Sequence, residues 1–188
     1  FQFPALGYSA IIQGLQKCHP EYQLHLLSII KNNKLKEFYR GSVTSYAEIS
    51  NQVTLQHNTA NNLNLLNIID IGRLLLFLVK LPISIFHSFA YFRKQDCNIV
   101  HLNSSVLVPQ ALGAWIANKK VVWHIREQPY HGIFGFRIKL LNLIFHKIAS
   151  KVIFICKADK ESWGGGRNSK VVYNPLPLEF EGCKKRDI

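Results

Sequence analysis

Residues 120–125 read KVVWHI, and this run decides the fold. It is short, apolar and rich in β-branched and aromatic side chains, which is typical of a strand buried within a parallel sheet. Polar residues lie at the carboxyl end of the run: His124 is its second-last residue, and Arg126 and Glu127 follow directly. The run therefore predicts a buried strand that carries functional groups at its carboxyl end.

Similar short apolar runs recur along the chain, separated by stretches with a helical pattern. Short buried strands that alternate with helices of about a dozen residues predict an α/β fold, a Rossmann-like parallel sheet with helices on both faces. The predicted strands are 22–30, 52–55, 98–103, 120–125, 151–156 and 170–173. The predicted helices are 8–18, 31–40 (a short helix or a loop), 68–94 (broken at Pro82), 106–117, 136–150 and 158–163. A loop is predicted at 128–135, and a helix-ending turn at 164–166.

Length and charge limit what the chain can be. Its 188 residues suffice for one compact α/β domain. There is no Met and the chain opens on Phe1, so we expect the sequence to be incomplete and the first strand to be missing. Lys and Arg number 23 against 11 Asp and Glu, a net charge of +12 that favours anionic partners: phosphates, nucleotides, nucleic acid or an anionic membrane.

The four cysteines, Cys18, Cys97, Cys156 and Cys183, have no zinc-site spacing, so we expect reduced, mostly buried thiols in a cytoplasmic protein and no metal. The segment 74–92 is strongly apolar, but Lys80, Pro82 and His87 interrupt it. We expect a buried helix rather than a membrane span. A helix that lies on a membrane surface stays an alternative.

In a parallel sheet, ligands bind at the carboxyl ends of the strands, so the polar residues there are the candidate site. His124 can hydrogen-bond a sugar hydroxyl or stabilise charge, or it can simply close the sheet edge. Arg126 offers a planar fork for phosphate or carboxylate, or is an ordinary surface charge. Glu127 can accept from hydroxyls or pair with Arg126. His101 points either to the core or to this edge. The other residues at strand ends are Asn103, Ser104, Ser105, Lys157, Asp159 and Asn174.

Several other chemistries have no support in the sequence. No strand is followed by the glycine pattern of a dinucleotide site or of a P-loop, and there is no nucleophile elbow and no metal-ligand cluster. No nucleic-acid recognition motif accompanies the basic charge.

Four segments together resemble the N-terminal domain of family-4-like glycosyltransferases of the GT-B fold. They are 98–103 (NIVHLN), 121–127 (VVWHIRE), 151–158 (KVIFICKA) and 170–180 (KVVYNPLPLEF). The resemblance covers about residues 5–182. It implies an N-terminal glycosyltransferase domain at 1–182, with the start of the interdomain linker at 183–188. Asn98 stands where the family commonly has Asp, and 176–178 differ from its usual Gly-Val-Asp. The family's C-terminal domain, with its paired-Glu donor motif, is absent.

The resemblance implies retaining transfer of a sugar from a nucleotide sugar to a glycan or lipid-linked acceptor in cell-envelope polysaccharide synthesis, without a cofactor or metal. His124 would be the catalytic His that faces the donor sugar. Gly7, in a loop before the first helix, would let the backbone approach the donor phosphates. Asn103, Ser104, Arg126 and Glu127 would bind substrate on the acceptor side.

We therefore expect a cytoplasmic enzyme, peripheral at the inner face of the cell membrane, whose basic surface suits an anionic membrane. No nucleic acid is expected as a partner. Two alternatives stay open: a Rossmann- or flavodoxin-like binding module without catalysis, and, with less support, a basic nucleic-acid-binding domain.

Overall fold

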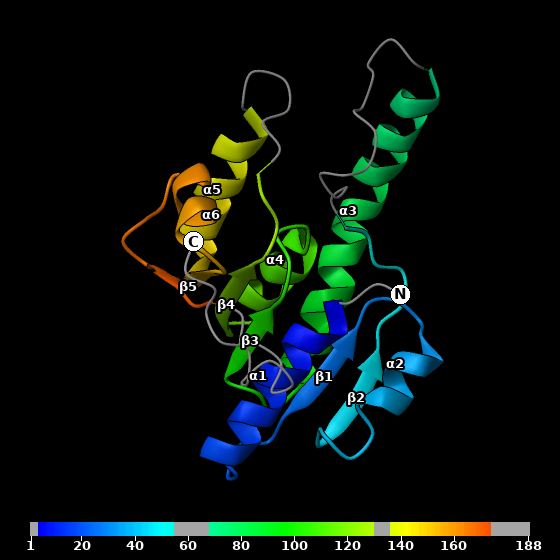
Figure 1. Cartoon of the computed structure of the whole chain (residues 1–188). Helices are drawn as coiled ribbons and strands as arrows, with labels where there is room; N and C mark the ends of the chain where they lie inside the picture. Colours follow the sequence, from blue (N-terminus) through cyan, green and yellow to red (C-terminus); the bar gives the residue numbers. More distant parts are fainter. Residues whose placement is uncertain (1–3, 55–67, 130–135, 174–188) are drawn as a thin grey trace.

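The structure is a computed structural model that describes residues 4–54, 68–129 and 136–173. Helices and strands alternate along the chain (Figure 1). In order they are α1 (Pro4–Cys18), β1 (His25–Ser28), α2 (Asn33–Phe38), β2 (Ser45–Glu48), α3 (Ile68–Lys94), β3 (Ile99–Leu102), α4 (Val108–Ile116), β4 (Lys120–Ile125), α5 (Phe136–Ile148), β5 (Ala149–Phe154), α6 (Lys157–Ser162) and β6 (Ser169–Val171).

All paired strands run parallel, which confirms the α/β class. They form two sheets, a small one of β1 and β2 and a larger one in the order β3-β4-β5-β6. In the larger sheet Leu102 of β3 lies beside Trp123 of β4, and His124 lies beside Ile153 of β5. Strand β4 is thus internal to the sheet and has a neighbour on each side, as the predicted buried strand requires.

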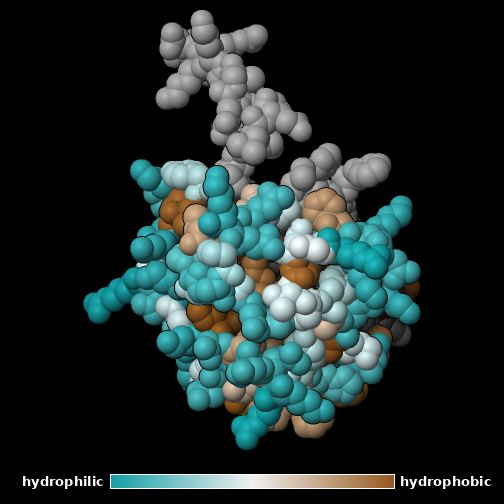
Figure 2. All heavy atoms as spheres, turned by 90° about the horizontal axis from the view of Figure 1, so that it is seen from below, coloured by the Kyte–Doolittle hydropathy of each residue, from teal (hydrophilic) through white to brown (hydrophobic). Residues whose placement is uncertain are grey.

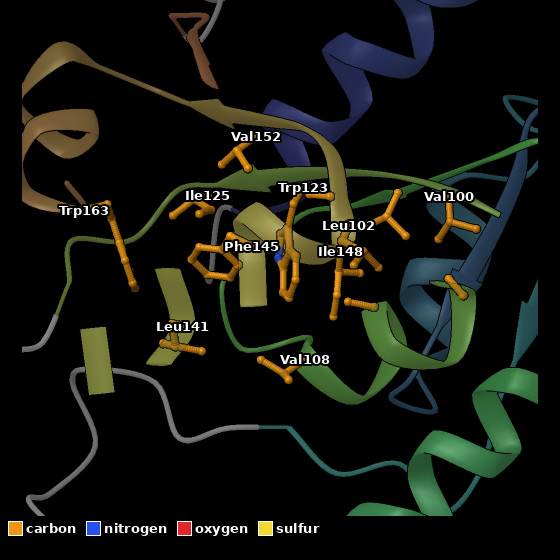
Figure 3. Close-up of a cluster of buried hydrophobic side chains, with 14 of the residues drawn as sticks. Val100, Leu102, Val108, Trp123, Ile125, Leu141, Phe145, Ile148, Val152 and Trp163 are labelled. Atoms are coloured by element: carbon orange, nitrogen blue, oxygen red, sulfur yellow. The ribbon is translucent and has the colours of Figure 1, made fainter. Parts of the chain in front are cut away.

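The hydrophobic core lies against one face of the larger sheet. Val121, Trp123 and Ile125 alternate along β4 and are fully buried, because side chains two residues apart on a strand share a face. Helices α4 and α5 cover them (Figure 3). The rings of Trp123 and Phe145 pack edge to face, with their centroids 4.4 Å apart. Helix α1 lies on the other side of the sheet from these side chains (Figure 3). Helices therefore lie on both faces, as predicted.

The strand predicted at 52–55 is wrong, and the second strand is instead β2. The Gln52 side chain explains the difference, because its Oε1 accepts hydrogen bonds from Ser84 (3.0 Å), Ser88 (2.9 Å) and Gln110 (2.7 Å). The Val53 N–H donates to Ser84 Oγ at 3.2 Å. This segment is thus attached to α3 and α4 by side-chain hydrogen bonds rather than by a strand ladder.

The break predicted at Pro82 is also wrong, since α3 runs without interruption from Ile68 to Lys94. A proline inside a helix removes one backbone hydrogen bond and costs about 3 kcal/mol. The turns of α3 that follow Pro82 pack against α4. Ser84 and Ser88, which lie in these turns, are buried. That packing offsets the loss. The expectation that this helix is buried is wrong for most of it, since burial is limited to one side of its C-terminal half, where Ser84, Ser88 and Phe92 lie.

Two further expectations concern turns and thiols. Gly164 and Gly165 have positive φ values of 77° and 53° and end α6, as predicted.

Cys18, Cys97 and Cys156 are free thiols. Cys18 is exposed and the other two are half-buried, so the expectation of mostly buried thiols is wrong for these three. Cys183 lies outside the described residues.

Gly113 of α4 lies in close contact with α3. A Cβ at Gly113 would lie 2.5 Å from Ser88 Cβ and 2.7 Å from the Phe89 backbone nitrogen, too close for either to remain where it is. We expect Gly113→Ala to lower the free energy of unfolding by about 1–3 kcal/mol despite alanine's better helix propensity. Gly14→Ala in α1 is the matched control, because nothing lies within 4 Å of its added Cβ. It should raise stability by about 0.5–1 kcal/mol. Urea unfolding followed by circular dichroism measures both, and equal effects would contradict the close contact.

Candidate functional site

The carboxyl ends of β3 and β4 lie side by side, because the two strands are parallel neighbours. The chain leaves β3 through Asn103 and Ser104, and it leaves β4 through Arg126 and Glu127. The side-chain hydrogen bonds between these two exits, given below, show that they meet at one edge. Four of the predicted site residues are therefore brought together around the end of β4.

Glu127 joins the two exits. Its Oε1 accepts a hydrogen bond from the Ser104 hydroxyl, and its Oε2 accepts from the N–H of Ser105 (3.0 Å) and of Arg126 (3.3 Å). The Glu127 backbone carbonyl accepts from the indole N–H of buried Trp163 at 2.8 Å. Glu127 and Ser104, both predicted to bind substrate, thus bind each other and fix the shape of this edge.

His124 projects from the face of β4 opposite the core, yet it is only 4% exposed. Its ring is stacked on that of His101 from β3, with centroids 5.6 Å apart and planes 10° from parallel. His101 is half-buried on this same face, so it lies beside His124 rather than in the core. Among the described residues, neither ring nitrogen of His124 has a hydrogen-bond partner.

The surroundings of His124 keep it neutral. Burial, which is the largest cause, and the nearby His101 and Arg126 together lower its pKa to about 4, whereas Glu127 acts in the opposite direction. Burial also lowers the pKa of His101. At neutral pH His124 therefore presents one N–H donor and one nitrogen acceptor. It can orient a hydroxyl or polarise an oxygen by hydrogen bonding, but it does not supply a positive charge.

Two more buried polar atoms at this edge have no hydrogen-bond partner among the described residues. They are the Asn103 Oδ1 and the Arg126 Nη1. A buried polar group without a partner costs about 1–3 kcal/mol, so most such groups in proteins are satisfied. Asn103, His124 and Arg126 together present donors and acceptors of the kinds that bind hydroxyls and phosphates.

Tyr39 is a residue of this site that the sequence did not reveal. It directly follows α2, is only 3% exposed, and lies near enough to Arg126 for the guanidinium to affect it. Burial raises the Tyr39 pKa, and the charge of Arg126 partly opposes that rise. The part of the chain that carries the small sheet thus brings a buried side chain within electrostatic range of Arg126. Nothing distinguishes Tyr39 within its polar, basic stretch of sequence.

Other candidate residues lie elsewhere or in different structure. Gly7 is inside α1 rather than in a loop before it, so the predicted loop is wrong. Lys157 is exposed at the start of α6, and Asp159 is buried in that helix. Asn174 lies outside the described residues. Across the described part of the chain, no group of three or more His, Cys, Asp or Glu could hold a metal ion.

A surface hollow lined by His146, Gly166, Arg167 and Asn168 lies away from this edge. His146 stands near the end of α5, which leads into β5, and Asn168 directly precedes β6. The hollow is therefore at the amino edge of the sheet, opposite the candidate site.

Comparison with known proteins supports the fold. The chain matches no model of a known protein family. It also matches no curated protein sequence. It is similar to the crystal structure of HepE from Anabaena in complex with UDP-glucose, with a TM-score of 0.56 and 14% identity. The match covers 94% of this chain but only 42% of the HepE chain, so this chain spans less than half of that protein. At such low identity the likeness shows the fold alone.

The buried His124 predicts a loss of stability in acid. Its pKa is about 4 in the folded protein against an ordinary value of 6.5 in the unfolded chain, so between these values the unfolded chain binds more protons. The contribution of His124 to the free energy of unfolding is therefore fully present above about pH 6.5. It is lost as the pH falls towards 4, by on the order of 2 kcal/mol. His101 acts in the same direction. Urea unfolding at about pH 7 and about pH 4.5 measures the loss.

His124→Gln, which cannot take up a proton, should make the free energy of unfolding clearly less dependent on pH. His25→Gln is the matched control, because His25 is exposed in β1, and it should leave the pH dependence unchanged. An unchanged pH dependence in His124→Gln would show that His124 is not the group responsible.

Glu127→Gln tests the junction between the two strand exits. The amide loses the charge and one of the two acceptor oxygens that now serve Ser104, Ser105 and Arg126. We expect the free energy of unfolding to fall by about 1.5–3 kcal/mol. Glu161→Gln, exposed on α6, should change it by less than about 0.5 kcal/mol. Equal values for the two variants in urea unfolding would argue against the junction.

Proposed function

We propose that this chain is the N-terminal, acceptor-side half of a retaining glycosyltransferase with a GT-B fold. The enzyme would transfer a sugar from a nucleotide sugar to a glycan or lipid-linked acceptor in cell-envelope polysaccharide synthesis. One observation carries the proposal: polar atoms of Asn103, His124 and Arg126 that are buried without partners among the described residues lie at the carboxyl edge of a Rossmann-like sheet. That edge is where such sheets bind ligands.

The fold and the sequence add support. A protein of similar fold, HepE, was crystallised with UDP-glucose. The order of the segments around His101, His124 and Lys157 resembles that of family-4-like enzymes. In this reading the donor is held mainly by a second domain, and the edge described above faces it across a cleft.

Each residue has a role that follows from its chemistry. His124, as a neutral imidazole, hydrogen-bonds the donor sugar and favours the charge that develops as the glycosidic bond breaks. Arg126 binds a phosphate or carboxylate, and Asn103 binds a hydroxyl. Glu127 and Ser104 act as positioning residues that hold Asn103 and Arg126 in place.

The setting of the enzyme is part of the proposal. The net charge of +12 suits a phosphate-bearing acceptor and an anionic surface. We place the enzyme in the cytoplasm, peripheral at the inner face of the cell membrane.

Turnover of nucleotide sugars by the full-length protein tests the proposal. Release of UDP from a panel of UDP-sugars, starting with UDP-glucose, gives a readout that does not require the acceptor to be known. His124→Ala should lower kcat by about 100-fold, because it removes a donor aimed at the reacting centre. Arg126→Ala should mainly raise the KM, by about tenfold, through loss of a charge-assisted contact. His25→Ala, exposed in β1, is the control and should act like the wild type.

Two outcomes would overturn the proposal. If calorimetry detects nucleotide-sugar binding but no sugar is released or transferred, the chain is a binding module without catalysis. If His124→Ala turns over as fast as His25→Ala, the edge of β4 is not where the chemistry occurs.

A further inference from the structure

Helix α3 is much longer than the sheet beside it. Its 27 residues span about 40 Å, whereas the four residues of β3 span about 13 Å. Because α3 leads directly into β3, its C-terminal end lies at the amino edge of the sheet. Its N-terminal half must then extend beyond the carboxyl edge, where Figure 1 shows it projecting from the body at the top of the view.

The outward face of this projecting helix is apolar. Six large side chains on it are exposed: Leu75, Leu76, Leu78, Val79, Ile83 and Phe86. At about 100° per residue they fall within less than half of the helix circumference. Ser84 and Ser88, which are buried against the body, lie on the other side. We call these six residues the outer face of α3.

This arrangement is the reverse of an ordinary surface helix, whose outward face is polar. Val79 is 65% exposed and Phe86 is 63% exposed, so the described part of the chain does not cover the outer face. Figure 2, which views the molecule from below, shows mainly hydrophilic residues with apolar ones in small separate patches. A continuous exposed apolar face of this kind marks an interaction surface.

The helix is apolar enough to enter lipid but is not placed to cross it. The window Leu75–Lys94 has a mean hydropathy of 1.7, with only 17% of it buried. Its second half packs closely against α4 at Gly113, and Ser84 and Ser88 hydrogen-bond Gln52, so this half is held on the body. The 16 residues of α3 before Ser84 span about 24 Å, less than the roughly 30 Å of a bilayer's hydrocarbon core. Contact with one leaflet is the arrangement that the geometry allows.

The charges identify the kind of leaflet. Lys80 is exposed at the border of the outer face, and Arg93 and Lys94 are exposed at the end of the same helix. The whole chain carries +12. Basic residues beside a membrane-inserted helix are each attracted to anionic headgroups by about 1 kcal/mol.

We infer that the outer face of α3 inserts into the headgroup region of an anionic membrane leaflet and docks the protein there. The docking places the membrane beside the carboxyl edge that carries His124 and Arg126. In the second step, which rests on the proposed function, an acceptor anchored in that leaflet reaches the edge without leaving the lipid. The docking itself holds whether or not the chain is part of a transferase.

Vesicle binding by the full-length protein tests the docking. The wild type should sediment with vesicles of equal parts phosphatidylcholine and phosphatidylglycerol, and at least about tenfold more weakly with phosphatidylcholine alone. A variant with Leu75→Gln, Val79→Gln and Phe86→Gln should bind the anionic vesicles at least about tenfold more weakly, because insertion scales with buried apolar area. These side chains are exposed, so the variant should keep the circular dichroism and urea midpoint of the wild type.

The matched control carries Ile30→Gln, Ile99→Gln and Val172→Gln, three exposed apolar residues that do not belong to the outer face of α3, and should bind like the wild type. No binding of the wild type, or equal loss in both triple variants, overturns the docking. Self-association without lipid that the α3 variant abolishes, with no vesicle binding, would show instead that a second copy covers this face.

Turnover separates the docking from the proposed function. If both hold, the α3 variant should release UDP from UDP-sugars as the wild type does, but should transfer sugar to a membrane-resident acceptor at least about tenfold more slowly. Vesicle binding without any turnover would retain the docking and reject the transferase. Turnover without vesicle binding would do the reverse.

Discussion

The structure depends on strand β4 being buried on both of its faces. One face carries Trp123 and its apolar neighbours into the core under α4 and α5, and the other carries His124. A parallel strand inside a sheet is normally apolar on both sides. Placing an imidazole in this position lowers its pKa to about 4 and leaves its nitrogens without partners among the described residues. The core on the opposite face offsets the unfavourable free energy of burying the His124 ring. The same strand therefore supplies both the core and the candidate site.

Glu127 makes this arrangement rigid. Through its carboxylate it holds the exit of β3, and through its backbone carbonyl it holds Trp163 at the end of α6. The indole of Trp123 donates to the Ser104 carbonyl at 2.7 Å, which fixes the same loop from the core side. Asn103 and Arg126 are therefore presented from segments that cannot easily move apart. Such preorganisation is what a binding edge requires, because the unsatisfied groups are oriented before any ligand arrives.

The sequence predicted the features that follow from local pattern. Strand β4 was predicted with its exact bounds, because a short apolar run rich in β-branched residues is typical of a buried strand. Strand β2 was missed, since Ser45-Tyr46-Ala47-Glu48 owes its conformation to pairing with β1 rather than to apolar content. The continuity of α3 through Pro82 depends on packing against α4, which local pattern does not contain. The same holds in the site: His124 and Arg126 followed from their place after a strand, but the contact of Glu127 with Ser104 and the approach of Tyr39 are tertiary.

Two energetically unfavourable features lie on one side of the molecule: buried polar atoms and exposed apolar side chains. At the carboxyl edge, polar atoms of Asn103, His124 and Arg126 are buried without partners among the described residues. On α3, which projects past that same edge, large apolar side chains face water. Each is unfavourable in the isolated chain, by about 1–3 kcal/mol per buried polar group and by comparable amounts per exposed large side chain. A molecule with a polar head and a lipid tail, resting in a membrane beside α3, would relieve both. That complementarity links the proposed acceptor to the proposed docking surface through the fold, since the length of α3 relative to β3 places the apolar face beside the polar edge.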